Sequence, residues 1–188
     1  GAVGADKYGE IVRDLCLSAG IELCPIETAR QNVKTRIIAN LHQIVRADNE
    51  PDLNANVAGP AISWAVLDYK DAGVVGTAIL SDYAKGVISA GVIETVFSVT
   101  EHVFLDPKVA HVDMYVASPK AFTAMTPNRS EAIALINALS RGSIVGNAVT
   151  DYFLGRRLRS LFPCTWSVVT LGADGALLTE PNERQWLF

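Results

Sequence analysis

Charged residues directly follow an apolar run of this sequence, and this is a position at which a ligand could meet the chain. The run Val74–Leu80 ends in Ser-Asp-Tyr-Ala-Lys-Gly at positions 81–86. Ligands of doubly wound sheets bind beyond the carboxyl ends of the strands, which would bring Asp82 and Lys85 to a ligand. A solvated turn with a local ion pair explains the same residues, because loops often carry charges.

Two further polar segments follow the same logic. Asp-Pro-Lys at 106–108 comes after the run His102–Leu105, and the Lys108 ammonium could reach an anionic group from this turn. Asn128 and Glu131 open a predicted helix with the spacing of a capping box. The same amide and carboxylate lie one turn apart and could hold a hydrated Mg²⁺, which needs few protein oxygens.

A glycine-containing turn follows another apolar run. Thr170 ends this run, and Gly172 and Gly175 follow it. Glycines allow the backbone to approach a bound nucleotide closely, but an ordinary β-hairpin turn explains them equally well. The segment is not a Walker A loop, because no Gly-Lys-Ser/Thr follows.

An expected hairpin near the N-terminus carries cations on one face. Lys34 and Arg36 are two residues apart on a strand and therefore point the same way, and Arg46 on the partner strand could join them. Such a cluster would suit a phosphate on a substrate, whereas a solvated face explains it without a ligand. The histidines show no metal-ligand spacing, and we expect His111, like the other two, to be structural or at the surface.

The bulk properties limit the classes of protein. The 188 residues suit one domain, and 16 Lys plus Arg against 20 Asp plus Glu give a net charge of −4, which argues against a nucleic-acid-binding protein. The sequence contains neither an apolar run long enough for a membrane span nor a signal peptide. The three cysteines have no metal-like spacing, and we expect buried thiols in a cytoplasmic protein.

The elements that would position these residues can be predicted from periodicity and turn signals. Asp6 can cap a helix over Lys7–Ala19, and strands Val33–Ile38 and Gln43–Ala47 form a hairpin with a four-residue loop. A loop over 48–59 then leads to a helix that begins at Pro60 and ends near Tyr69.

After this point strands and helices alternate. The expected strands are Val74–Leu80, His102–Leu105, Met114–Ala117, Trp166–Leu171 and Ala176–Thr179, and the expected helices are Ser89–Glu101, Glu131–Leu139 and Asn147–Leu161. This alternation predicts an α/β fold with a doubly wound, mostly parallel sheet and helices on both faces. The early hairpin lies outside the alternation and forms a separate small sheet.

The order of the motifs is more specific than any one of them. They are Lys34-x-Arg36, Gln-Ile-Val-Arg-x-Asp at 43–48, Ser-Asp-Tyr-x-Lys-Gly at 81–86, Asp-Pro-Lys at 106–108, Thr-Pro-Asn-x-x-Glu at 126–131 and Val-Thr-Leu-Gly-x-x-Gly at 169–175. This succession resembles the ribokinase (PfkB) family of carbohydrate kinases. The motifs at 81–86 and 106–108 are similar to the heptose-7-phosphate kinase branch, which acts in ADP-heptose synthesis.

The resemblance implies transfer of the γ-phosphoryl group of ATP to a hydroxyl group of a sugar or sugar phosphate. Residues 33–47 would be a lid over the sugar, often shared in a homodimer, and residues 60–188 would be the core of one partial ribokinase-like domain. Sugar or sugar phosphate would lie near Lys34, Arg36, Asp82 and Lys85. Nucleotide and phosphates would lie near Lys108, Asn128, Glu131, Thr170, Gly172 and Gly175, with Mg²⁺ held by Asn128 and Glu131 through water.

The chain also departs from this family. The family's Gly-Ala-Gly-Asp motif, whose Asp is the general base, does not occur within residues 1–188, and the chain looks cut at both ends. We therefore expect the base in a segment outside this sequence. The alternative is a catalytically inactive, kinase-like subunit or scaffold that binds a partner or nucleotide. A different nucleotide-binding module is disfavoured, because neither Gly-x-Gly-x-x-Gly nor a Walker A loop occurs.

Overall fold

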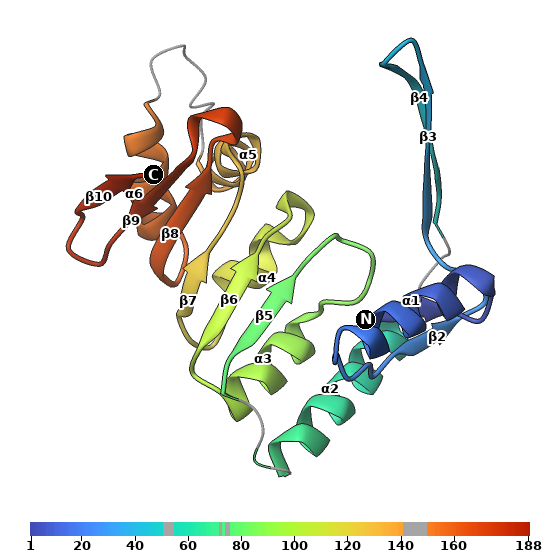
Figure 1. Ribbon diagram of the computed structural model, residues 1–188. Helices are drawn as coiled ribbons and strands as arrows, with labels where there is room; N and C mark the ends of the chain where they lie inside the picture. The colour runs from blue at the N-terminus through green and yellow to red at the C-terminus, as the bar shows by residue number, and fades with distance from the viewer. Residues whose placement is uncertain (51–54, 72, 74–75, 141–149) are drawn as a thin grey trace.

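The N-terminal part is a small unit beside the main body (Figure 1). The computed structural model describes residues 1–50, 55–71, 73, 76–140 and 150–188. Strand β1 (Ala2–Gly4) pairs in parallel with β2 (Ile26–Thr28), and helix α1 (Lys7–Ser18) lies between them in sequence. The Asp6 carboxylate accepts the backbone N–H of Gly9 at 3.0 Å, which confirms the predicted helix and its cap.

The hairpin consists of β3 (Val33–Ala39) and β4 (His42–Asn49) and rises as a separate ribbon away from the central sheet (Figure 1). The predicted four-residue loop is wrong, because Ala39 pairs with His42 and only Asn40 and Leu41 lie between them. Both turn residues have positive φ angles, 47° and 66°, which is the geometry whose twist matches that of the paired strands.

Helix α2 (Ala55–Asp71) begins earlier than predicted, and Pro60 lies inside it rather than at its start. A proline inside a helix removes one backbone hydrogen bond without having to end the helix. The predicted loop over 48–59 is therefore too long, although residues 51–54 lie outside the described part of the chain. Helix α3 (Ala90–Val99) is confirmed, with Ser89 as its N-cap.

The central sheet has the strand order β10-β9-β8-β7-β6-β5. Its strands are β5 (Ala78–Ser81), β6 (Val103–Asp106), β7 (Phe122–Met125), β8 (Cys164–Thr170), β9 (Ala176–Thr179) and β10 (Gln185–Leu187). Strands β5 to β8 are parallel, whereas β9 and β10 are antiparallel to their neighbours. The predicted α/β fold with a mostly parallel sheet is confirmed.

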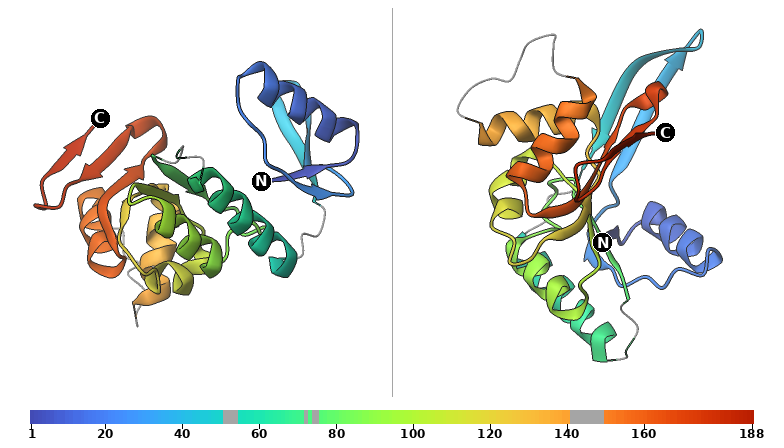
Figure 2. Two further views of the ribbon diagram at one scale, coloured as in Figure 1. Left: turned by 90° about the horizontal axis from the view of Figure 1, so that it is seen from below. Right: turned by 90° about the vertical axis from the view of Figure 1, so that its left-hand side faces the viewer.

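Helices α3, α4 (Val112–Val116), α5 (Arg129–Leu139) and α6 (Asp151–Leu161) pack on one face of this sheet (Figure 2). The row Leu80, Leu105 and Met125 faces them and is buried. On the opposite face, Ile79 is 75% exposed. The prediction placed helices on both faces; within the described residues, these four lie on one.

Several short elements differ from the prediction. Residues 112–116 form helix α4, not an extended piece, and strands β7 and β10 were not predicted. Elements of three to five residues contain too few positions to show the hydrophobic periodicity that distinguishes a helix from a strand. Residues 74–75 and 147–149 of two predicted elements lie outside the described part of the chain, in which no helix has the length and apolar character needed to cross a bilayer. Cys164 is buried as expected, but Cys24 is exposed.

Candidate active site

The carboxyl ends of the four parallel strands bring the predicted polar segments into one row. Backbone hydrogen bonds tie each loop to its neighbour: the Asp82 N–H donates to the Asp106 carbonyl at 2.9 Å, and the Thr126 N–H donates to the Leu105 carbonyl at 2.9 Å. The Thr170 N–H donates to the Pro127 carbonyl at 3.0 Å. The segments after β5, β6, β7 and β8 therefore form one continuous edge, which is where ligands bind in sheets of this kind.

An ammonium and a carboxylate meet at the centre of this row. Lys108 forms an ion pair with Glu131, whose side chain is mostly buried. The Glu131 carboxylate raises the pKa of Lys108, mainly through the hydrogen bond between them. The Lys108 ammonium also lies 5.8 Å from the centre of the Tyr83 ring, at the distance of a cation–π contact. A positive charge is thus held in place where a phosphate could be bound.

Asn128 and Glu131 form the predicted capping box. The Asn128 side chain accepts the backbone N–H of Glu131 at 2.9 Å, and the Glu131 carboxylate accepts the backbone N–H of Asn128 at 3.1 Å. The structural role of this pair is therefore confirmed. Binding of Mg²⁺ by the same two residues stays a prediction.

Asp106 adds a second carboxylate next to Glu131. Burial raises its pKa, the negative charge of Glu131 raises it further, and Lys108 and a hydrogen bond from Ser81 lower it. No group of three or more metal-ligating acids, histidines or cysteines occurs among the described residues. The oxygen donors present fit a Mg²⁺ ion held mainly through water, since this ion keeps several waters and needs one or two carboxylates.

Asp82 is buried rather than open to a ligand, with 2% of its surface exposed. One carboxylate oxygen accepts hydrogen bonds from the Tyr115 hydroxyl at 2.5 Å and from His111 Nδ1 at 2.6 Å. The other accepts the backbone N–H of Ala84 at 2.7 Å. Sequence reasoning missed Tyr115 and assigned no role to His111, although their four-residue spacing would place them on the same face of a helix.

Lys85 forms an ion pair with Glu50, which follows β4. The pair lies beside a cavity of about 250 Å³ between the N-terminal unit and the loop after β5. The cavity is lined by Ala2, Thr28, Gln31, Asn32, Glu50, Tyr83, Lys85 and Val87. Lys85 therefore lies where the N-terminal unit and the core meet.

Lys34 and Arg36 lie on the hairpin, away from the row of strand ends. Arg36 is directly opposite Arg46 in the ladder, and Arg46 forms an ion pair with Asp48 at 3.0 Å. The expected grouping of Arg36 with Arg46 is present. Because the hairpin rises away from the sheet (Figure 1), the structure does not bring this cation cluster to Asp82.

The turn after β8 has a clear structural explanation. Gly172 and Gly175 have positive φ angles of 67° and 92°, and a side chain at Gly175 would come within 1.7 Å of the Phe188 carbonyl oxygen. Arg129 bonds Asp151 at 2.8 Å and Asp174 at 3.1 Å, linking α5 and α6 to this turn. The hairpin turn is thus confirmed, and contact of Thr170 and the glycines with a nucleotide stays a prediction.

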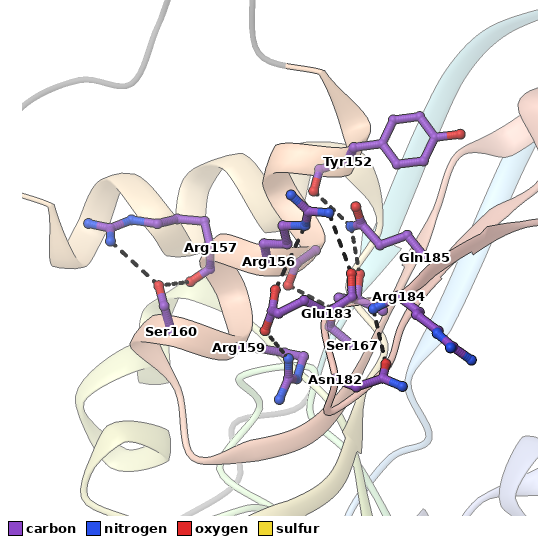
Figure 3. Close-up of polar contacts among 12 residues, drawn as sticks. Tyr152, Arg156, Arg157, Arg159, Ser160, Ser167, Asn182, Glu183, Arg184 and Gln185 are labelled. Carbon is purple, nitrogen blue, oxygen red and sulfur yellow. Dashed lines mark hydrogen bonds and ion pairs between the residues drawn. The ribbon is translucent and has the colours of Figure 1, made fainter.

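A second hollow, a groove of about 580 Å³, lies between α6 and the β9–β10 hairpin (Figure 3). In its lining Arg156 pairs with Glu183, which also pairs with Arg159. Strand β9 runs antiparallel to β8, so the end of β9 lies toward the beginning of β8. The β9–β10 turn and the groove therefore lie at the amino ends of the parallel strands, away from the row of polar segments at their carboxyl ends. We assign it a role in joining α6 to the hairpin.

Comparison with known proteins places this arrangement in a family. A model of the family described as "pfkB family carbohydrate kinase" matches residues 1–187. The bifunctional protein HldE of Campylobacter curvus is 29% identical over 94% of this chain and 36% of its own length. The HldE of Trichlorobacter lovleyi is 30% identical over 99% of this chain and 35% of its own length. The chain thus spans about a third of the length of these relatives.

Solved structures agree on the fold. A phosphofructokinase-2 mutant from Escherichia coli superposes with a TM-score of 0.73 at 17% identity, covering 100% of this chain and 59% of that one. The ribokinase of Thermotoga maritima superposes with a TM-score of 0.71 at 18% identity, covering 100% of this chain and 57% of that one.

Proposed function

Because the chain belongs to the pfkB family of carbohydrate kinases, we propose that it takes part in ATP-dependent phosphorylation of a sugar or sugar phosphate. The γ-phosphoryl group of ATP would pass to a hydroxyl oxygen of the sugar, with ADP as the leaving group. The observation that carries this proposal is the ion pair of Lys108 with Glu131, which also forms a capping box with Asn128, at the carboxyl ends of the parallel strands.

The residues of this row would bind and align the phosphates. Lys108 supplies a point charge for the transferred phosphoryl group, and Glu131 with Asn128, supported by Asp106, would hold Mg²⁺ through water. The ion, when bound, neutralises charge on the phosphate oxygens. Thr170 and the glycines of the following turn would lie along the nucleotide. Phosphoryl transfer depends chiefly on such alignment and charge neutralisation, so these side chains need not form covalent bonds.

The sugar would occupy the cavity beside Lys85, under the lid. Heptose 7-phosphate is the substrate we favour, because the motifs at 81–86 and 106–108 resemble that branch and because the matched relatives are HldE proteins. Lys34, Arg36 and Lys85 would face the sugar phosphate after closure of the lid. Asp82 is buried and would support the loop beside this site rather than touch the sugar. The general base would come from a segment outside residues 1–188, and the reaction would take place in the cytoplasm.

The test measures ADP release by the complete gene product that contains residues 1–188. Mg-ATP is offered with heptose 7-phosphate, ribose and fructose 6-phosphate in separate reactions. We expect turnover with heptose 7-phosphate, and a fall in kcat of about a hundredfold in Lys108→Met, since one charge that stabilises a transition state contributes on this scale.

Lys120→Met is the matched control, because Lys120 is exposed and its ammonium bonds the Phe97 carbonyl, away from the row. Its kcat should stay within about twofold of wild type, as for surface substitutions in general. No ADP release with any sugar would refute the kinase proposal. Binding of Mg-ADP by that inactive protein, measured by calorimetry, would instead support a kinase-like subunit that binds nucleotide.

A further inference from the structure

The buried group formed by Asp82, His111 and Tyr115 is not explained by contact with a ligand. Three donors converge on the Asp82 carboxylate, so its oxygens point into the protein rather than toward the cavity. A buried carboxylate is retained only where hydrogen bonds satisfy it, because leaving it unpaired is costly. The group therefore has a positional role.

Tyr115 connects this carboxylate to the candidate phosphate site. Its hydroxyl donates to Asp82 at 2.5 Å and accepts the backbone N–H of Lys108 at 3.0 Å. The Tyr115 ring is fully buried, and burial together with Asp82 raises the pKa of its hydroxyl, so it stays protonated and can donate. One hydroxyl thus couples the loop after β5 to the loop after β6.

His111 completes the group from the surface side. A carboxylate oxygen is an acceptor, so the Nδ1 atom 2.6 Å away must carry the hydrogen. Its side chain is 28% exposed, whereas that of Asp82 is 1% exposed. His111 therefore covers the carboxylate and keeps Asp82 directed at Tyr115.

We propose that Asp82, Tyr115 and His111 form a relay of positioning residues that holds the Lys108 backbone, and thereby its ammonium, beside Glu131. Asp82 orients the Tyr115 hydroxyl, and this hydroxyl holds the first residue after the Asp-Pro turn. The relay itself is a structural statement, and only its effect on catalysis rests on the proposed kinase function.

The first test measures amide hydrogen exchange by NMR in Tyr115→Phe, which removes the hydroxyl and keeps the ring. We expect the Lys108 amide to exchange about tenfold faster, as expected for loss of one hydrogen bond. The Thr126 amide, which bonds Leu105 across β6 and β7, should be unchanged. Unchanged exchange at Lys108, or an equal increase at Thr126, would overturn the relay.

A second pair of variants tests the relay independently, in case Tyr115→Phe does not fold. His111→Ala removes a donor to Asp82 and should also speed exchange at Lys108, whereas His111→Asn retains a donor and should restore slow exchange. Equal exchange in these two variants would contradict the role of His111.

The kinetic test uses the complete gene product with its sugar substrate. Tyr115→Phe should lower kcat about tenfold and leave the sugar KM within twofold, because small misplacements of aligned groups cost rate. Tyr152→Phe, in the groove beside α6, should change neither. An unchanged kcat in Tyr115→Phe would overturn the positioning role. A wild-type protein without kinase activity would refute the proposed function, while the exchange data would still decide the relay.

Discussion

Single side chains at the row of strand ends serve the fold and the candidate site together. Glu131 caps α5 with one carboxylate oxygen and pairs with Lys108 through the other. Removal of this side chain would therefore disturb a helix start and the position of a cation at once. Activity lost in a Glu131 variant would not by itself separate these two roles.

Asp106 offers a cleaner measurement at the residue scale. Its pKa is raised above the usual 3.8, first by burial and then by Glu131. Between the usual and the raised pKa, the folded protein holds a proton that the unfolded chain has lost, so the free energy of unfolding falls as pH rises through this window. Asp106→Asn should remove this fall. Its stability relative to wild type should increase with pH in the window and then level off.

Urea unfolding at a series of pH values from about 4 to 7 checks this prediction. Ser81→Ala is the matched variant, because a hydrogen bond from Ser81 lowers the Asp106 pKa. Loss of this hydrogen bond should raise the pKa of Asp106 further, so that the fall in stability continues to higher pH. A constant stability difference between Asp106→Asn and wild type at every pH would contradict the assignment.

At the scale of elements, α6 is joined to the β9–β10 hairpin mainly through Arg159 (Figure 3). Its guanidinium donates to the Thr165 carbonyl at 2.8 Å and to the Pro181 carbonyl at 3.2 Å, and it pairs with Glu183. The side chain is only 14% exposed. These contacts connect the helix to the start of β8 and to the β9–β10 turn.

Arg159→Leu should lower the free energy of unfolding by about 2 kcal/mol, because it removes the donor to two carbonyls and one of the two arginines paired with Glu183. Arg157→Leu on the same helix is the control, since Arg157 bonds Ser160 within its own helix at 3.5 Å. It should change stability by less than about 0.5 kcal/mol. Equal losses in the two variants, measured by chemical denaturation, would show that the joint does not depend on Arg159.

At the scale of the molecule, the β3–β4 hairpin exposes apolar side chains that its own two strands cannot cover. Leu41 at the tip is 98% exposed, and Ile37, Ile38, Ile44 and Val45 are each about half exposed or more. Among the described residues, neither outer edge of this two-stranded ribbon pairs with a further strand, and such edges can pair with another chain. A second copy of the chain is the partner we predict for this surface.

We therefore expect the complete gene product to form a homodimer, and Ile44→Lys to shift it to monomer. A buried lysine at the interface would be desolvated without a partner, which opposes association. Light scattering after size-exclusion chromatography gives the mass. Leu17→Lys, on an exposed position of α1, should leave the dimer intact. A monomeric wild-type protein at all concentrations would contradict the prediction.

The sequence alone determined the elements with long or strongly marked patterns and their order. The helix after Asp6, the capping box at Asn128 and the parallel strands β5, β6 and β8 could be predicted, because caps and apolar runs act locally. The family resemblance followed from the same motifs. Short elements such as β7 and α4 could not be predicted, because their form depends on the neighbours they pack against.

Only the tertiary structure decided how the candidate site is built. It turned Asp82 inward and placed Tyr115 and His111 on its carboxylate, contacts that span 33 and 29 residues of sequence. It also paired Lys108 with Glu131 across 23 residues. Residue type and spacing show which groups can donate or accept, but the packing of β5, β6 and α4 decides which of them meet. Burial makes these contacts important for stability, because a buried charge without hydrogen-bond or ionic partners within the fold carries a large free-energy cost.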